Sequence, residues 1–239
     1  SQRGSVADRE IAGIWMRANG LDFAPDRFAV TPGAHASIYA ILTLLSEPGQ
    51  VMLCETLTYP GIRSIAASLG LRLVGVPSDQ EGLRPEALER AITEHWPAAL
   101  YLNPTLQNPT TLTMSAARRR EIAAVLKRHD LPLVEDDAYR FVAAEAPPPL
   151  SSHVPDLAWH VAGISKCFGA GLRLAYTTGP QRAEMGGFSQ ALRSINVMAS
   201  PLSLALLGHW IEDGTAAQIQ AFVRRAAAQR QELARGILC

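Results

Sequence analysis

Residues 159–177 read WHVAGISKCFGAGLRLAYT and contain two apolar segments separated by a short loop. Short, largely apolar runs of this length indicate strands. We predict strands at 159–164 and 172–177, with Lys166 in the loop between them. A lysine that directly follows an apolar strand is the first candidate functional residue of the chain.

The same alternation of short apolar runs and helical patterns continues upstream of this stretch, and it is typical of βαβ units around a mainly parallel sheet. Further strands are predicted at 28–31, 51–55, 72–76, 99–102 and 133–135. Helices are predicted at 8–18, 34–45, 61–69, 85–95 and 115–128, and after the last strand at 181–195, 201–212 and 216–238. We therefore expect an α/β fold with three layers (α/β/α), a mainly parallel seven-stranded sheet and a helical C-terminal extension.

Composition excludes several classes of protein. The 239 residues include 22 Lys and Arg against 22 Asp and Glu, so the chain has no overall positive charge to attract nucleic acid. Cys54, Cys167 and Cys239 have no metal-type spacing, and their odd number argues against a disulfide framework, which favours a reducing, cytoplasmic location. No apolar stretch approaches the roughly 20 residues that span a bilayer. We expect a soluble cytoplasmic protein without a membrane partner.

Chemically useful residues follow the predicted strands. In an open parallel sheet, ligands bind at the carboxyl ends of the strands. The segments at these ends are TPGAHA (31–36), TYPG (58–61), NPTLQNPT (103–110), EDDAY (135–139) and SK (165–166), and Arg173 stands at the start of the last strand. Together they place a lysine, an arginine, an acid pair, two tyrosines, an asparagine and a helix that begins at glycine at one edge of the sheet.

Lys166 has two interpretations. Desolvation at the end of an apolar strand lowers the pKa of a lysine, and the neutral amine is the form that makes Schiff bases. A solvated lysine at a strand end explains the same pattern. Lys127 is the other lysine of the chain and falls on a polar helix, so Lys166 is the candidate amine nucleophile.

The other candidates also keep two interpretations each. A carboxylate at Asp136 or Asp137 that is buried in the crevice needs a cationic partner such as a protonated pyridine nitrogen, but a loop or helix-capping acid fits too. The helix that begins at Gly33 offers free N–H groups to a phosphate, as any βα turn can. Arg173 suits a phosphate or an ordinary strand end. Tyr59 suits stacking on a flat ring or packing on the surface.

Taken in order and spacing, TPGAHA, TYPG, QNPT, EDDAY and SK followed by GLRLAY resemble the aminotransferase class I/II group of fold type I enzymes, which use pyridoxal phosphate. The resemblance covers nearly the whole chain and implies the large domain of that fold. The last third, including SPLSLALLGHWIEDGT (200–215), resembles the aminotransferase-like domain of MocR-type GntR regulators. In those regulators a DNA-binding winged helix precedes this domain.

The resemblance implies a role for each candidate. Lys166 forms the Schiff base with the cofactor and moves a proton between the substrate α-carbon and the cofactor. Asp136 pairs with the pyridine nitrogen, and it is preferred over Asp137 because it lies three residues before Tyr139, as in the family. Tyr139 and Asn108 hydrogen-bond the phenolic oxygen of the cofactor.

The remaining implied roles concern the ring face and the phosphate. Tyr59 stacks on the ring, while Arg173 and the N–H groups of Ala34 and His35 hold the phosphate.

Three functions remain open for the whole protein. The resemblance implies that residues 1–239 are the large domain of a longer protein, with a DNA-binding module or arm before it and a small domain after it. We expect the effector-sensing part of a MocR-type regulator, which binds pyridoxal phosphate and an amino acid or other small amine, forms a homodimer, and reaches DNA only through another module. The alternative is the catalytic large domain of an aminotransferase. A domain kept only for dimerisation is the least favoured.

Overall fold

A seven-stranded sheet forms the centre of the fold. The computed structural model of the chain describes residues 3–180 and 182–238, so Gln181, the predicted start of a helix, and Cys239 lie outside the described residues. In spatial order the strands are β1 (Phe28–Thr31), β9 (Ala175–Thr178), β8 (Ala158–Gly163), β7 (Leu133–Asp136), β6 (Ala99–Leu102), β2 (Val51–Glu55) and β3 (Arg72–Val76). Only β9 is antiparallel to its neighbours, β1 and β8. The expected mainly parallel sheet is confirmed.

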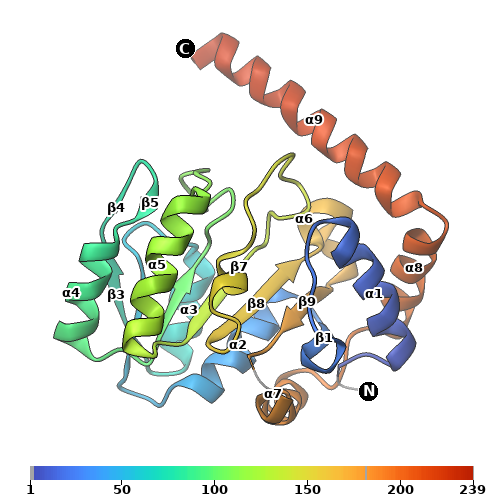
Figure 1. Cartoon of the computed structure of the whole chain (residues 1–239). Coiled ribbons are helices and arrows are strands. Elements are labelled where there is room, and N and C mark those ends of the chain that lie inside the picture. The colour runs from blue at the N-terminus through green and yellow to red at the C-terminus, as the bar shows by residue number, and fades with distance from the viewer. Residues whose placement is uncertain (1–2, 181, 239) are drawn as a thin grey trace.

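Helices cover both faces of the sheet (Figure 1). One face is packed by α2 (Ala34–Leu45), α3 (Pro60–Ser68) and α7 (Arg182–Ile195). The other is packed by α4 (Pro85–His95) and α5 (Ala116–His129) over one half, and by α1 (Val6–Ala18), α6 (Ser165–Phe168) and α8 (Pro201–Glu212) over the other half. This arrangement confirms the three-layer α/β/α prediction.

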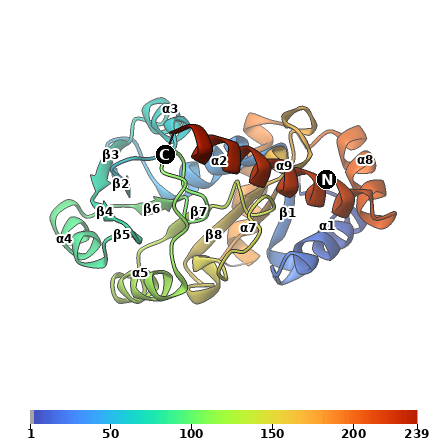
Figure 2. The ribbon, with the colours of Figure 1, turned by 90° about the horizontal axis from the view of Figure 1, so that it is seen from above.

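The last helix, α9 (Thr215–Leu238), leaves the body of the domain (Figures 1 and 2). Only Ala216 and Gln220 of its residues are buried. The Gln220 amide donates to the carbonyl oxygen of Phe141 at 2.8 Å, and Arg224 Nε donates to the same oxygen at 3.2 Å. The helical C-terminal extension is confirmed. None of the described helices has the length and apolarity needed to cross a bilayer.

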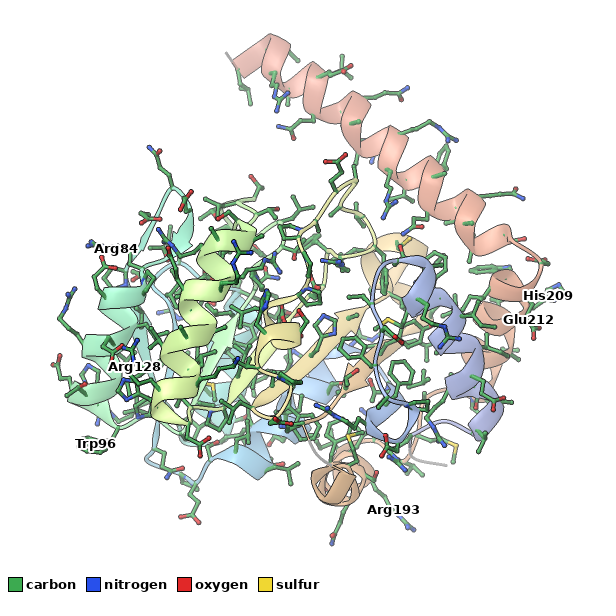
Figure 3. All side chains as sticks on the ribbon, in the orientation of Figure 1. Arg84, Trp96, Arg128, Arg193, His209 and Glu212 are labelled. Carbon is green, nitrogen blue, oxygen red and sulfur yellow. The ribbon has the colours of Figure 1, made fainter. Side chains whose placement is uncertain are left out.

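A local signal marks the start of α5. The Ser115 side chain accepts from the N–H of Arg118 and so caps α5, as expected of a serine at that position. At the other end of α5, Arg128 pairs with Glu89 of α4. Figure 3 shows Arg128 among the side chains on the outer side of these two helices. The Arg128 side chain is 60% exposed, so this pair lies at the surface.

The predicted strand at 172–177 is wrong at its start. Residues Ala170–Leu172 form a short 3-10 helix, and β9 begins only at Ala175. Arg173 has φ = 50°, a left-handed conformation that a strand does not accommodate. The turn before it depends on Gly169, whose φ is 101°. Arg173 therefore lies in the loop, between the 3-10 helix and the start of β9.

Smaller differences occur elsewhere. The predicted bounds are the observed ones for the strands at 28–31, 51–55, 72–76 and 99–102 and for the helices at 34–45, 85–95 and 201–212. The other described ends differ by no more than two residues. The two-residue strands β4 (Ser78–Asp79) and β5 (Gly82–Leu83), which form a separate hairpin, had no signal in the sequence. Two further 3-10 helices occur at Pro25–Arg27 and Leu150–His153.

A buried ion pair joins α5 to the sheet. Arg119 and Glu135 have fully buried side chains whose charged atoms lie 3.5 Å apart. Arg119 also donates to the carbonyl oxygens of Met114 and Pro104, both at 3.0 Å. Glu135 accepts the N–H of Ser151 at 2.7 Å. The pair thus fixes the segment that follows β6 as well as the segment that leads into β8.

Removal of Arg119 should strongly destabilise the fold. Arg119→Met leaves the Glu135 carboxylate buried without its cation, so we expect a loss of about 3–5 kcal/mol in the free energy of unfolding. Urea denaturation followed by circular dichroism measures this loss. The exposed neighbour Arg120 provides the matched control, because Arg120→Met should change the free energy by less than about 0.5 kcal/mol. Equal losses in the two variants would contradict the prediction.

Candidate functional site

A cavity of about 140 Å³ lies where the parallel strands end. The antiparallel strand β9 starts at the edge of the sheet where the others finish, so the residues that precede it reach the same place. The structure brings all the residues nominated from the sequence to the wall of this cavity: Ala34, His35, Tyr59, Asn108, Asp136, Tyr139, Lys166 and Arg173.

Asp136 is the buried acid of the cavity. It is the last residue of β7 and only 4% exposed. Its Oδ2 accepts from the Tyr101 hydroxyl at 2.7 Å, and its backbone carbonyl accepts from the Asn103 amide at 2.6 Å. Its Oδ1 is buried without a hydrogen-bond partner among the described residues. Burial raises the pKa of Asp136 to about 6. This arrangement leaves one carboxylate oxygen free for an N–H donor in the cavity.

Asp137 serves a different part of the molecule. It is fully buried, is absent from the wall of the cavity, and its Oδ2 lies 3.1 Å from Nε2 of His160. The His160 hydrogen bond and charge hold the pKa of Asp137 below its usual value despite its burial. Of the two adjacent acids, Asp136 is the one that faces the cavity.

Three buried side chains on the other side of β7 lie close enough together to hold a metal ion: Glu135, Asp137 and His160, with ligand atoms within 4.8 Å of one another. Both oxygens of Glu135 already accept backbone N–H groups, and Arg119 supplies a positive charge beside it. Asp137 and His160 bond each other. These contacts already occupy the three side chains, so the cluster serves to hold α5, β7 and β8 together.

One end of the cavity is suited to an anion. Helix α2 begins after Gly33, whose φ of 100° favours glycine, and none of the described side chains caps its first turn or adds an acid to it. The first N–H groups of a helix have no partner within the helix and carry partial positive charge. A Cβ built on Gly33 would lie 3.8 Å from the Arg173 guanidinium, so this cation lies beside the helix N-terminus.

Hydrogen bonds between hydroxyl groups hold this end in place. Thr31 Oγ1 lies 2.6 Å from Ser37 Oγ, and Thr177 Oγ1 donates to Ser37 Oγ at 3.0 Å. Because these residues belong to β1, α2 and β9, the N-terminus of α2 is fixed to two strands.

Lys166 differs from the expectation in its surroundings. It lies in the short helix α6 and not at a strand end, because β8 already stops at Gly163. Its side chain is exposed, so the described residues do not desolvate it as expected. Its Nζ lies 5.5 Å from the centre of the Tyr139 ring, within the range of a cation–π contact. The amine therefore stands at the mouth of the cavity, beside a second candidate residue.

Gln107 joins the two loops that carry Tyr59 and Asn108. Its Nε2 donates to the Leu57 carbonyl at 2.6 Å, and its Oε1 accepts from the Thr110 N–H at 2.8 Å. A Cβ on Gly61 would lie 2.2 Å from the Tyr59 ring, so glycine is needed for the ring to lie where it does. The position of Tyr59 thus depends on Gly61, and the loop that carries Asn108 is held by Gln107.

Three positioning residues were not found from the sequence: Tyr101, Asn103 and Gln107. Asn103 and Gln107 lie inside the quoted NPTLQNPT segment, and their polar character after a strand was a usable signal. Tyr101 lies within an apolar strand, where an aromatic residue indicates a core position and nothing about its hydroxyl group.

Glu55 lies buried behind the Tyr59 loop. It is 4% exposed, at the end of β2, and its Oε2 accepts from Gln107 Nε2 at 3.3 Å. Burial raises its pKa from 4.5 to about 7, and the Gln107 hydrogen bond only partly opposes this effect.

Comparison with known proteins gives a consistent picture. Residues 6–237 match the family described as aminotransferase class I and II. The chain is 32% identical over 207 residues to the uncharacterized HTH-type transcriptional regulator YdeF of Bacillus subtilis. This alignment covers 87% of this chain and 45% of YdeF. It is 36% identical over 165 residues to the aminotransferase swnA of Metarhizium robertsii, in an alignment that covers 62% of this chain and 33% of swnA. The chain thus spans less than half the length of these relatives.

The fold also occurs among solved structures. The α-aminoadipate aminotransferase LysN of Thermus thermophilus, solved with N-(5'-phosphopyridoxyl)-L-leucine, superposes with a TM-score of 0.84 at 24% identity. The match covers 94% of this chain and 57% of LysN. At this level of identity the likeness shows the fold.

The raised pKa of Glu55 predicts how stability depends on pH. The folded protein holds this proton more tightly than the unfolded chain, so the free energy of unfolding should fall as pH rises from about 4.5 to about 7. Glu55→Gln removes this effect. Relative to wild type, the variant should gain up to about 3 kcal/mol between pH 4.5 and pH 8, measured by urea denaturation. The exposed Glu47 supplies the control variant Glu47→Gln, and an equal gain there would refute the assignment to Glu55.

Proposed function

The chain belongs to the aminotransferase class I and II family, and from this premise we propose that it is the cofactor-binding, effector-sensing domain of a MocR-type transcription regulator. The observation that carries the proposal is the gathering of the family's motif residues around one cavity, in a chain that also resembles an HTH-type regulator over 87% of its length. Pyridoxal phosphate is the cofactor of this family.

The residues of the cavity fit this cofactor. Oδ1 of Asp136, which is buried and has no partner among the described residues, is an acceptor for the protonated ring nitrogen. The free N–H groups of Ala34 and His35 at the start of α2, with Arg173 beside them, form a cradle for the phosphate. Tyr59 lies in the wall of the cavity, where its ring would stack on the cofactor ring. When bound, pyridoxal phosphate supplies an aldehyde that condenses with amines and a ring that accepts electrons.

Three further residues of the cavity wall have proposed roles: Lys166 in covalent attachment, and Tyr139 and Asn108 at the phenolic oxygen of the cofactor. We propose that Lys166 holds the cofactor covalently through Nζ, and that the same amine carries a proton when an amino compound takes its place. Tyr139 and Asn108 donate hydrogen bonds to the phenolic oxygen. Because the Tyr139 ring also contacts the Lys166 side chain, it limits the directions in which the amine can move.

The proposal for the whole protein extends beyond the described residues. YdeF is named an HTH-type regulator and is more than twice as long as the matched segment. We propose that DNA is bound by another module, that an amino acid or other small amine is the effector, and that the protein is a cytoplasmic homodimer. The two described cysteines, Cys54 and Cys167, are buried free thiols, in keeping with a reducing compartment.

A second function has its own support. The similarity to the aminotransferase swnA, at 36% identity, is higher per residue than that to the regulator YdeF but covers less of the chain. The same set of residues, Lys166 with Asp136 and Tyr139, serves transamination. The alternative is therefore the catalytic large domain of an enzyme that moves amino groups between an amino acid and a 2-oxo acid.

Lys166 should be the site of covalent attachment. Pyridoxal phosphate added to the protein should give a visible absorbance band, and borohydride should then add the reduced cofactor irreversibly, which peptide mass spectrometry should locate at Lys166. Lys166→Ala should abolish the band and the mass increase. Lys127→Ala removes the other lysine and should leave both unchanged. Attachment at Lys127 in place of Lys166 would overturn the proposal.

DNA binding separates the two functions of the whole protein. The longer protein that contains this chain should bind a DNA fragment from its own upstream region, and pyridoxal phosphate with an amine should change the dissociation constant. Residues 1–239 alone should not bind that fragment, because their Lys and Arg residues equal their Asp and Glu residues at 22 each. Fluorescence anisotropy measures both. Steady transamination by the longer protein, without DNA binding, would establish the enzyme instead.

A further inference from the structure

The hydroxyl group of Tyr101 is placed to control Asp136. We propose that Tyr101 is a positioning residue, which occupies Oδ2 of Asp136, directs Oδ1 to the cavity and keeps the carboxylate charged for the ring nitrogen of the cofactor. The inference deepens the proposed function and rests on it for the identity of the cofactor. Tyr101 is absent from the wall of the cavity, so it acts only through Asp136.

The geometry comes from the pairing of β6 with β7. Tyr101 is opposite Val134 in the parallel register, and its hydroxyl reaches Asp136 Oδ2 at 2.7 Å. Two residues further along, the Asn103 amide holds the backbone carbonyl of Asp136 at 2.6 Å. The end of β6 therefore fixes both the main chain and the carboxylate of Asp136. With the backbone carbonyl and Oδ2 held in this way, Oδ1 is the carboxylate oxygen that has no hydrogen-bond partner among the described residues.

Tyr101 is a permanent donor. Its side chain is 0% exposed, and burial together with the nearby Asp136 charge raises its pKa well above the ordinary value. The hydroxyl thus keeps its proton at any pH at which the protein functions. A hydrogen bond from a neutral hydroxyl to a carboxylate favours the charged form of the acid.

The groups around Asp136 have opposing effects on its pKa. Burial and the charge of Asp137 raise its pKa, whereas the Tyr101 hydroxyl, the charge of His160 and the Ala138 N–H lower it. Tyr101 is the first of the contributions that favour the carboxylate. Without its hydroxyl, Asp136 would take up a proton at higher pH and would pair less well with a protonated ring nitrogen.

The chain offers a matched control. Tyr176 of β9 is also buried, at 2% exposed, and packs its ring against Phe28 and Phe141 away from the wall of the cavity. Tyr101→Phe and Tyr176→Phe each remove one buried hydroxyl from a strand of the same sheet. A difference between them therefore reports the contact with Asp136 and not the loss of a hydroxyl as such.

The first experiment needs no cofactor. Carbon-13 NMR of protein labelled at aspartate carboxyl groups follows the titration of Asp136, which is assigned by the signal lost in Asp136→Asn. Tyr101→Phe should move this titration to higher pH, and Tyr176→Phe should leave it in place. An unchanged titration in Tyr101→Phe would overturn the proposal, whether or not the protein binds pyridoxal phosphate.

The second experiment measures the dissociation constant of pyridoxal phosphate by its absorbance. Tyr101→Phe should weaken binding about tenfold, as expected for a hydrogen bond to a charged group, and Tyr176→Phe should not. In Asp136→Asn the further change Tyr101→Phe should have little effect, because both substitutions remove the same interaction. Additive losses would show a separate structural role and contradict the proposal. Failure of the wild-type protein to bind would count against the proposed function alone.

Discussion

The burial of three consecutive acids at the end of the central strand β7 constrains everything around them. Side chains alternate between the two faces of a strand, so Glu135 and Asp137 point to one face and Asp136 to the other. Each buried carboxylate requires its own compensation. Arg119 of α5 meets Glu135, His160 of β8 meets Asp137, and the Tyr101 hydroxyl meets one oxygen of Asp136. The Asp136 oxygen that the described residues leave unpaired is the one available to the cavity.

Much of the fold followed from the sequence because its strands are short apolar runs that lie beside well-marked turns. The helix that starts after Gly33 occurs as predicted, and the helix predicted at 115–128 carries a local signal at its start, the Ser115 cap of α5. The region around Arg173 could not be predicted in the same way. Its apolar neighbours Leu172 and Leu174 read as a strand, yet the loop closes through left-handed conformations that depend on how it packs.

The site, like the fold, contains features that the sequence predicts and features that depend on packing. Residues at strand ends, such as Asp136 and Lys166, could be nominated because a polar side chain after an apolar run is conspicuous, and the direction of parallel strands then brings the candidates together. The contacts that those residues make could not be predicted from the sequence. The hydroxyl of Tyr101 lies in an apolar strand, and only the register between β6 and β7 reveals what it bonds. The exposure of Lys166 likewise depends on packing and not on its neighbours in sequence.

The attachment of α9 gives the domain a mechanical property. Gln220 and Arg224 bind the carbonyl of Phe141, two residues after Tyr139 of the cavity wall. From Gln220 to Leu238 the helix extends for roughly 27 Å, at about 1.5 Å per residue. Because a rigid helix turns rotation into translation, a tilt of about 10° at Gln220 moves Leu238 by roughly 5 Å. A tilt of α9 at Gln220, where the helix is bound to the segment that follows Tyr139, is therefore enlarged at Leu238.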